Sequence, residues 1–384
     1  MRRLAARGEP QLGRQRIGRR AVAACRVAGA VLLGTASLGV ATVGRHRAVA
    51  APAPRPAAVA EQPPPTSSPQ APAVMIAGAD GVDLTGEWLV DRGGLYYLFV
   101  STAFGDGRHN VPLVVGRPGR WSAPVDALPV LPAWATPVAD GGTTWQPEVK
   151  RLGRHWVLYF SGLVRGSQPP EHCIGTAVSS TVAGPYRPSP FPIVCQRDEG
   201  GDIDAQVVAD PASPGPQLYL VWKSDNNVLP TGGSDLIWSQ PLASDGLSLT
   251  GTPAVIFGSQ AAPSWAQPIV EAPQLVRSPL GGWWLFYSGG GGFLSAHYAI
   301  GVARCLSVSG PCVPAGAGPL ISSNDQGPGP GEESVFQHGA SFWVLYSPWY
   351  SGIPWALFRP VAAARVGWGP SGPYVASAGA FPSP

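Results

Sequence analysis

Short runs of apolar and aromatic residues, each closing on a small polar residue, recur along the chain. They occupy residues 96–101 (YYLFVS), 156–161 (WVLYFS), 219–224 (YLVWKS), 284–288 (WLFYS) and 343–347 (WVLYS). Runs of this length, rich in Tyr, Trp, Val and Phe, predict buried β-strands. The closing serines recur about every sixty residues, so the sequence contains five copies of one unit.

Each copy holds further strand signals on both sides of the aromatic run. An apolar stretch precedes a glycine-containing turn, and a third strand follows, as at 173–177 and 298–303. Four-stranded sheets repeated at a fixed period predict a propeller, because each blade buries its faces against its neighbours. A β-sandwich is the alternative, but it gives no reason for five equal periods. The sequence therefore predicts an all-β fold, a five-bladed β-propeller over residues 75–384.

Composition supports this interpretation and excludes some partners. The 384 residues include Gly 50, Pro 44 and Trp 14, and only 13% are charged, which is typical of strands joined by tight turns and leaves little helix. The formal net charge of +3 comes largely from arginines before residue 50. We therefore expect no nucleic-acid partner for the folded part.

The N-terminal region has the sequence pattern of a targeting segment followed by a linker. Residues 1–50 have a basic stretch, an apolar stretch and a small-residue site in that order, which indicates a signal peptide or, alternatively, an uncleaved N-terminal anchor. Residues 51–74 are rich in Pro and Ala and predict a disordered linker. We expect a monomer that is secreted or associated with the cell envelope, with membrane association through the N-terminus as a possibility.

Four cysteines fall in the predicted domain. An even number in an oxidising compartment favours disulfides, and proximity in the sequence suggests Cys173–Cys195 and Cys305–Cys312. Metal binding is the alternative, but the sequence has no C-x-x-C pair.

Polar residues at the start of the first strand of each unit are the candidate site. In a propeller these strands line the central axis, so their first residues converge on one cleft. The segments are 145–149 (WQPEV), 202–206 (DIDAQ) and 270–274 (VEAPQ). Carboxylates and aromatic rings around one cavity suit a sugar, because rings stack on its C–H faces and carboxylates supply the acid and base that cleave a glycosidic bond. Trp145, Gln146 and Trp222 are the candidate substrate contacts.

These segments, with 110–112 (NVP), 121–129 (WSAPVDALP) and 195–204 (CQRDEGGDID), resemble family 43 glycoside hydrolases, the arabinanase and β-xylosidase group, in its actinobacterial members. The resemblance runs from about residue 80 to the C-terminus. It implies an inverting hydrolase with three catalytic carboxylates. By its pattern, Glu271 in V-E-A-P matches the general acid, and Asp204 in D-I-D-A matches the aspartate that orients the acid and raises its pKa.

The third carboxylate departs from the family pattern. The family has a D-P pair about ten residues before the first tyrosine pair, and its aspartate activates the attacking water. Here that position holds Gly86, followed by Glu87. Glu87 reaches the water only if the strand slips or bulges, since successive strand residues point to opposite faces. Asp83, in the preceding loop, is the other candidate for the base.

The resemblance also implies a metal ion in the central channel, near a histidine in the fifth blade. Glu332 stands where that histidine is expected, and a carboxylate oxygen suits Ca²⁺. We expect Ca²⁺ to be the cofactor, if there is one.

Three functions remain open at this point. The first is hydrolysis of a polysaccharide or oligosaccharide that contains arabinose, xylose or galactofuranose. The second is a catalytically weakened propeller that acts as a glycan-binding module, which the missing aspartate favours. The third is a scaffold for protein ligands, which leaves Asp204 and Glu271 unexplained.

Overall fold

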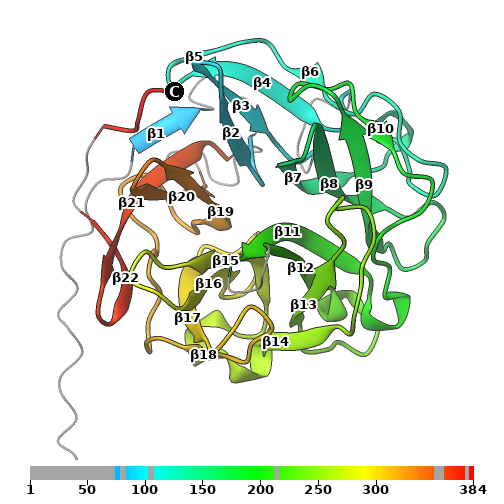
Figure 1. Ribbon diagram of the computed structural model, residues 1–384. Coiled ribbons are helices and arrows are strands. Elements are labelled where there is room, and N and C mark those ends of the chain that lie inside the picture. Colours follow the sequence, from blue (N-terminus) through cyan, green and yellow to red (C-terminus); the bar gives the residue numbers. More distant parts are fainter. Residues whose placement is uncertain (1–73, 78–83, 103–107, 212–215, 350–358, 377–379) are drawn as a thin grey trace, which may run out of the picture. The chain divides into compact units, whose positions relative to one another are not determined.

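The computed structural model describes residues 74–77, 84–102, 108–211, 216–349, 359–376 and 380–384. Five sheets follow one another around a ring in this part of the chain (Figure 1). The predicted five-bladed, all-β propeller is therefore confirmed, and helix in the described residues is limited to five short 3-10 turns. The targeting segment at 1–50 and the linker at 51–74 stay predictions, because all but Val74 lie outside the described residues.

Four of the five blades follow the chain without interruption. The strands of blade 1 are β2 (Trp88–Arg92), β3 (Leu95–Phe99), β4 (Pro112–Arg117), β5 (Arg120–Trp121) and β6 (Val125–Asp126). Those of blade 2 are β7 (Thr144–Leu152), β8 (His155–Leu163), β9 (His172–Ser179) and β10 (Arg187–Pro188). Those of blade 3 are β11 (Asp202–Asp210), β12 (Gln217–Ser224), β13 (Leu236–Leu242) and β14 (Ala254–Gly258). Those of blade 4 are β15 (Val270–Arg277), β16 (Trp283–Gly289), β17 (Ala299–Cys305) and β18 (Cys312–Pro314).

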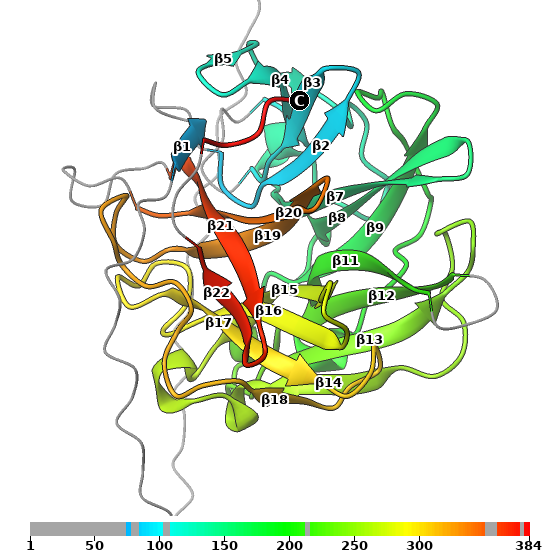
Figure 2. The ribbon, with the colours of Figure 1, turned by 60° about the vertical axis from the view of Figure 1, so that its left-hand side comes forward.

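Blade 5 combines both ends of the described chain. Its strands are β19 (Gly331–His338), β20 (Ser341–Ser347), β21 (Val361–Gly369), β22 (Gly372–Val375) and β1 (Val74–Ala77). β1 pairs antiparallel with β21, with Val74 opposite Ala363 (Figure 2). Because the first strand completes the last blade, the sheet that closes the ring is held by hydrogen bonds between distant parts of the chain.

The aromatic runs form the second strand of each blade and are buried. Packing takes place between blades as well as within them: one apolar cluster joins Val221 and Ile237 of blade 3 to Leu285 and Tyr287 of blade 4. A single blade would expose these apolar faces to water, which explains why the five blades form a closed ring.

Two disulfides link neighbouring segments. Cys173 is bonded to Cys195, and Cys305 to Cys312, which joins β17 to β18. Both predicted pairs are confirmed. Among the described residues, no helix is long and apolar enough to cross a membrane.

Candidate active site

One backbone feature recurs at the inner end of every blade. A residue with positive φ stands just before the first strand in blade 1 and at the second or third residue of that strand in the other blades, and we call this position the slot. The slot residues are Gly86 (φ 61°), Gln146 (42°), Asp204 (59°), Ala272 (51°) and Glu332 (57°). Left-handed conformations are costly for residues other than glycine and cluster at functional sites. In blades 2 to 5 each slot lies within a break in the strand register, so a β-bulge aims the residues around it.

The serines that close the aromatic runs hold three of the slots in place. The hydroxyl oxygen of Ser101 accepts a hydrogen bond from the backbone N–H of Gln146 (2.9 Å). In the same way Ser161 accepts from Asp204 (3.1 Å), and Ser288 from Glu332 (3.0 Å). The serine of one blade thus fixes the slot of the next blade.

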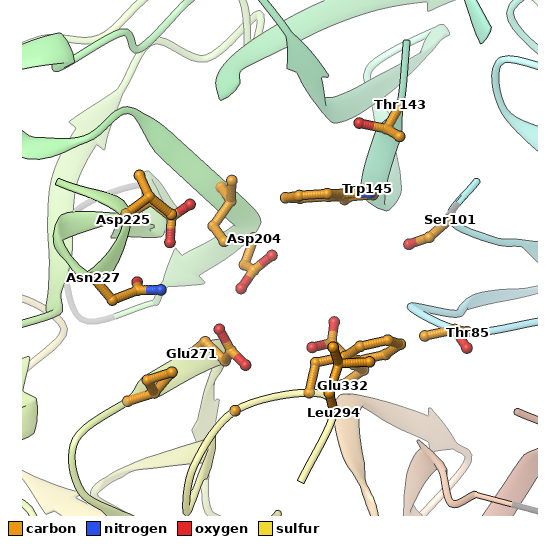
Figure 3. Close-up of a pocket in the computed structure, with 15 residues that line it drawn as sticks. Thr85, Ser101, Thr143, Trp145, Asp204, Asp225, Asn227, Glu271, Leu294 and Glu332 are labelled. Atoms are coloured by element: carbon orange, nitrogen blue, oxygen red, sulfur yellow. The ribbon is translucent and has the colours of Figure 1, made fainter. Parts of the chain in front are cut away.

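The inner strand ends surround a pocket of about 360 Å³. Four of its lining residues are carboxylates, Asp204, Asp225, Glu271 and Glu332. Figure 3 shows the carboxylates of Asp204, Glu271 and Glu332 directed toward one space, with Trp145 at its edge. The expectation that the strand starts of different blades converge on one cleft is confirmed.

Glu271 is held at both carboxylate oxygens. Its Oε2 accepts a hydrogen bond from Lys223 Nζ at 3.0 Å, and its Oε1 accepts one from the hydroxyl of Tyr298 at 2.7 Å. The side chain is buried to 8% exposure. A buried carboxylate with a partner on each oxygen has a fixed orientation, which suits a group that transfers a proton along one direction.

Lys223 is a cation inside the aromatic strand β12, with no exposed surface. Besides Glu271, its Nζ lies 2.8 Å from Asp225 and 3.8 Å from Asp235. Burial works against its charge, but Glu271, Asp225 and Asp235 together raise the pKa of Lys223 well above its usual range. Lys223 is therefore charged and ties carboxylates of blades 3 and 4 together. It was not predicted from the sequence, although a lysine within a buried aromatic run is a visible signal.

Asp204 lies beside the acid candidate. Its Oδ2 accepts a hydrogen bond from the backbone N–H of Ala272 at 2.9 Å, which fixes it next to the residue that follows Glu271. Burial, and then the nearby carboxylates Glu332 and Glu271, raise the pKa of Asp204 well above its usual range. Asp204 is therefore a buried carboxylate that is fixed by the backbone next to Glu271.

Glu332 is the second carboxylate in the slot series, after Asp204. Its Oε1 accepts a hydrogen bond from the Tyr298 hydroxyl at 2.9 Å, and its Oε2 accepts one from Gln146 Nε2 at 3.0 Å. Burial and the charge of Glu271 raise the pKa of Glu332 from 4.5 to about 7, although Arg359 opposes the shift.

The calcium interpretation of Glu332 has little support from its neighbours. Both of its oxygens already accept hydrogen bonds from protein groups. In the described ranges no group of three or more His, Cys, Asp or Glu side chains is placed to hold a metal ion. Calcium takes six to eight oxygen ligands, so a site here would need oxygens beyond these side chains. The calcium site stays a prediction.

The three candidate sugar contacts have different positions. Trp145 lines the pocket and stacks on His172 with ring centroids 3.7 Å apart. Burial lowers the pKa of His172 to about 3, so a neutral ring supports Trp145. The side-chain amide of Gln146 donates a hydrogen bond to Glu332. Trp222 is a correction: it is 1% exposed, its indole N–H binds Asp202, and it does not line the pocket, because the centre of the second strand packs between blades.

Of the two sequence candidates for the base, Asp83 lies outside the described residues, and Glu87 does not line the pocket. Glu87 is buried, is absent from the pocket lining, and accepts a hydrogen bond from Ser347 of blade 5 at 2.8 Å. Glu333 repeats this arrangement one blade earlier, with Ser288 as its donor. Glu87 is therefore one of two buried glutamates that bind the serine of the preceding blade.

Five blades, a pocket on their inner ends and several carboxylates within it define a glycoside hydrolase type of propeller. Comparisons with known proteins agree. The family model described as "Glycosyl hydrolases family 43" matches residues 126–373. This chain belongs to family 43 of the glycoside hydrolases. A comparison with curated proteins finds no match.

Solved structures show the same fold. A thermostable family-43 glycoside hydrolase is 21% identical, with a TM-score of 0.66 over 83% of this chain and 98% of the other. An exo-1,5-α-L-arabinanase from a bovine ruminal metagenomic library is 18% identical, with a TM-score of 0.59 over 77% and 97%. An endo-1,4-β-xylanase from Bacteroides thetaiotaomicron is 18% identical, with a TM-score of 0.62 over 79% and 97%.

Proposed function

We propose that this protein is a secreted hydrolase that cleaves arabinose-, xylose- or galactofuranose-containing glycans with inversion at the anomeric carbon. The observation that carries the proposal is the pocket with Glu271 held by Lys223 and Tyr298 and flanked by Asp204. The names of the similar structures, an arabinanase and a xylanase, support a pentose substrate. The two disulfides support export.

In the proposed reaction Glu271 gives its proton to the leaving oxygen as the glycosidic C–O bond breaks. Asp204 keeps the acid oriented, and Trp145 stacks on the apolar face of a sugar ring. A water molecule attacks the anomeric carbon from the opposite side, and its proton passes to a base. The family's blade 1 aspartate is replaced by Gly86 here, so the base must come from elsewhere.

The first experiment is turnover of 4-nitrophenyl α-L-arabinofuranoside, β-D-xylopyranoside and β-D-galactofuranoside. We expect one of them to be hydrolysed, and proton NMR of the fresh product to show the inverted anomer. A protein that hydrolyses none of these probes, and no arabinan or xylan, contradicts the proposal.

The glycan-binding alternative is favoured by one observation, the glycine at the first slot. It predicts binding of a pentose oligosaccharide without turnover. Isothermal titration with arabinan or xylan fragments, followed by analysis of the recovered sugar, separates the two functions, because a binding module returns its ligand intact.

A further inference from the structure

Two polar side chains of the pocket come from the turn that follows β12. This strand ends at Ser224, which pairs with Asp202 at the start of β11. The chain therefore continues past the start of the inner strand, and there Asp225 and Asn227 line the pocket. Because the slot residue Asp204 lies two positions inside β11, these two side chains lie farther from the interior of the propeller than Asp204 does.

Lys223 fixes the orientation of both side chains. Its Nζ donates to Oδ1 of Asp225 at 2.8 Å, to Oδ1 of Asn227 at 3.0 Å and to Oε2 of Glu271 at 3.0 Å. An ammonium group has three N–H donors and no acceptor. All three donors are therefore used, and the atom of Asn227 that faces the lysine must be its oxygen. The amide nitrogen points away from the lysine, and Figure 3 shows it directed into the pocket.

The two atoms left for a ligand are one acceptor and one donor. Within the described part of the chain, the hydrogen bonds of these side chains leave Oδ2 of Asp225 and Nδ2 of Asn227 without a protein partner. A carboxylate oxygen accepts a hydrogen bond from a hydroxyl group, and an amide N–H donates one. The pair therefore suits two neighbouring hydroxyl groups of a sugar ring. A few polar groups placed in this way fix the orientation of a ligand in a pocket.

The charge of the pocket limits the kind of sugar. Its described lining residues include four carboxylates and no Lys, Arg or His. Lys223, the cation behind them, has no N–H left for a ligand. A carboxyl group on the ligand would face Asp225 without a counterion, and such a contact between like charges is strongly unfavourable. The site therefore suits a neutral sugar.

We propose that Asp225 and Asn227 bind the leaving sugar, whose oxygen receives the proton of Glu271, and that this sugar is neutral and has two neighbouring hydroxyl groups. The inference rests on the proposed hydrolase function. Glu271 shares Lys223 with both residues, so the leaving oxygen is bound next to them. The ring that carries the anomeric carbon lies deeper, beside Asp204, and the leaving ring lies farther out.

Calorimetric titration tests this subsite in the Glu271→Gln background, where no bond is cleaved. One ligand is the shortest oligosaccharide that the wild type hydrolyses. The other is the matching methyl glycoside, in which a methyl group replaces the leaving ring. Asn227→Ala removes the donor, and Asp225→Asn keeps an oxygen for Lys223 but removes the charge from the acceptor. Each should weaken oligosaccharide binding by about 3–10-fold and leave methyl glycoside binding unchanged.

Asn226→Ala is the matched control. Asn226 lies in the same turn but does not line the pocket, and its side chain binds Ser224 and Glu199 instead. Its loss should not change the ratio of the two affinities, and thermal melting checks that every variant is folded.

A second ligand pair tests the charge requirement. An oligosaccharide with a uronic acid as its leaving ring should bind at least about tenfold more weakly than the neutral one, because its carboxylate faces Asp225.

The outcomes separate the subsite from the function. Unchanged oligosaccharide affinity in either Asn227→Ala or Asp225→Asn overturns the subsite and leaves the hydrolase standing. Equal weakening of both ligands also overturns it, because the two residues would then act only by holding Lys223. Equal affinity for the uronic and neutral ligands overturns the requirement for a neutral sugar. A wild type that hydrolyses no oligosaccharide contradicts the proposed function and the subsite together.

Discussion

Blades 1 and 5 have similar sequences at their inner ends but differ in the side chains that they contribute to the pocket. Blade 1 has Gly86 in the slot and Glu87 after it. Blade 5 has Glu332 in the slot and Glu333 after it. The residue after the slot is buried against the serine of the preceding blade in both cases, but of the two slot residues only Glu332 lines the pocket. One position along the strand therefore decides whether a glutamate is a buried hydrogen-bond acceptor or a pocket carboxylate.

The pocket carboxylates and the buried ones also differ in what keeps them there. The buried glutamates need only a hydroxyl donor, because burial favours their neutral form. The pocket carboxylates need a cation, Lys223, and a shared donor, Tyr298. The pocket carboxylates thus share charged and hydroxyl partners, whereas the two buried glutamates each bind a serine of the preceding blade.

The largest effect is expected for Glu271→Gln. The glutamine keeps the shape but has no proton to give, so hydrolysis of arabinan or xylan oligosaccharides should fall by about 10²–10⁴-fold. A 2,4-dinitrophenyl glycoside, whose leaving group needs little protonation, should be affected far less. Loss that is equal for both substrates would contradict the assignment of the acid.

Lys223→Met sharpens the contrast between pocket and buried carboxylates. It leaves the charges of Asp225, Asp235 and Glu271 without their buried partner, and breaking such a pair costs about 3–5 kcal/mol of unfolding free energy. Urea unfolding measures the loss. The comparison fails if Glu87→Gln, which removes no charged partner, destabilises the protein as much.

The smallest expected effect concerns the first slot itself. Gly86→Ala should cost about 1–2 kcal/mol for the left-handed backbone, and more because the new Cβ overlaps Ser101 Oγ. Gly153→Ala is the matched control, since φ there is +58° and nothing lies within 4 Å of the Cβ position. Equal losses in thermal unfolding would show that the first slot is open to a side chain after all.

The fold was predictable because it repeats. Five aromatic runs ending in serine specify five blades, and the serines then turn out to bind the slots. The places of Glu271, Asp204 and Trp145 in the pocket lining were also predictable, since they sit at the starts of inner strands, while their roles stay proposals. Strand position alone did not reveal which face a residue takes when a bulge intervenes. Trp222 was placed in the site because of its ring, although its strand position buries it.

The residues that bind the pocket carboxylates could not be predicted from the sequence. Lys223 reaches Glu271 from another blade, and Tyr298 reaches Glu332 from blade 4, so no local pattern joins them. Glu332 was noticed as a metal ligand because a family histidine is missing there. Its contact with Gln146, beside the unused first slot, appears only when the ring is closed.

The central claim is that Glu271 is the general acid, and a crystal structure of Glu271→Gln with a bound pentose oligosaccharide tests it most directly. The account predicts that the side-chain amide of residue 271 lies about 2.6–3.2 Å from the glycosidic oxygen. A glycosidic oxygen out of reach of residue 271 would contradict it.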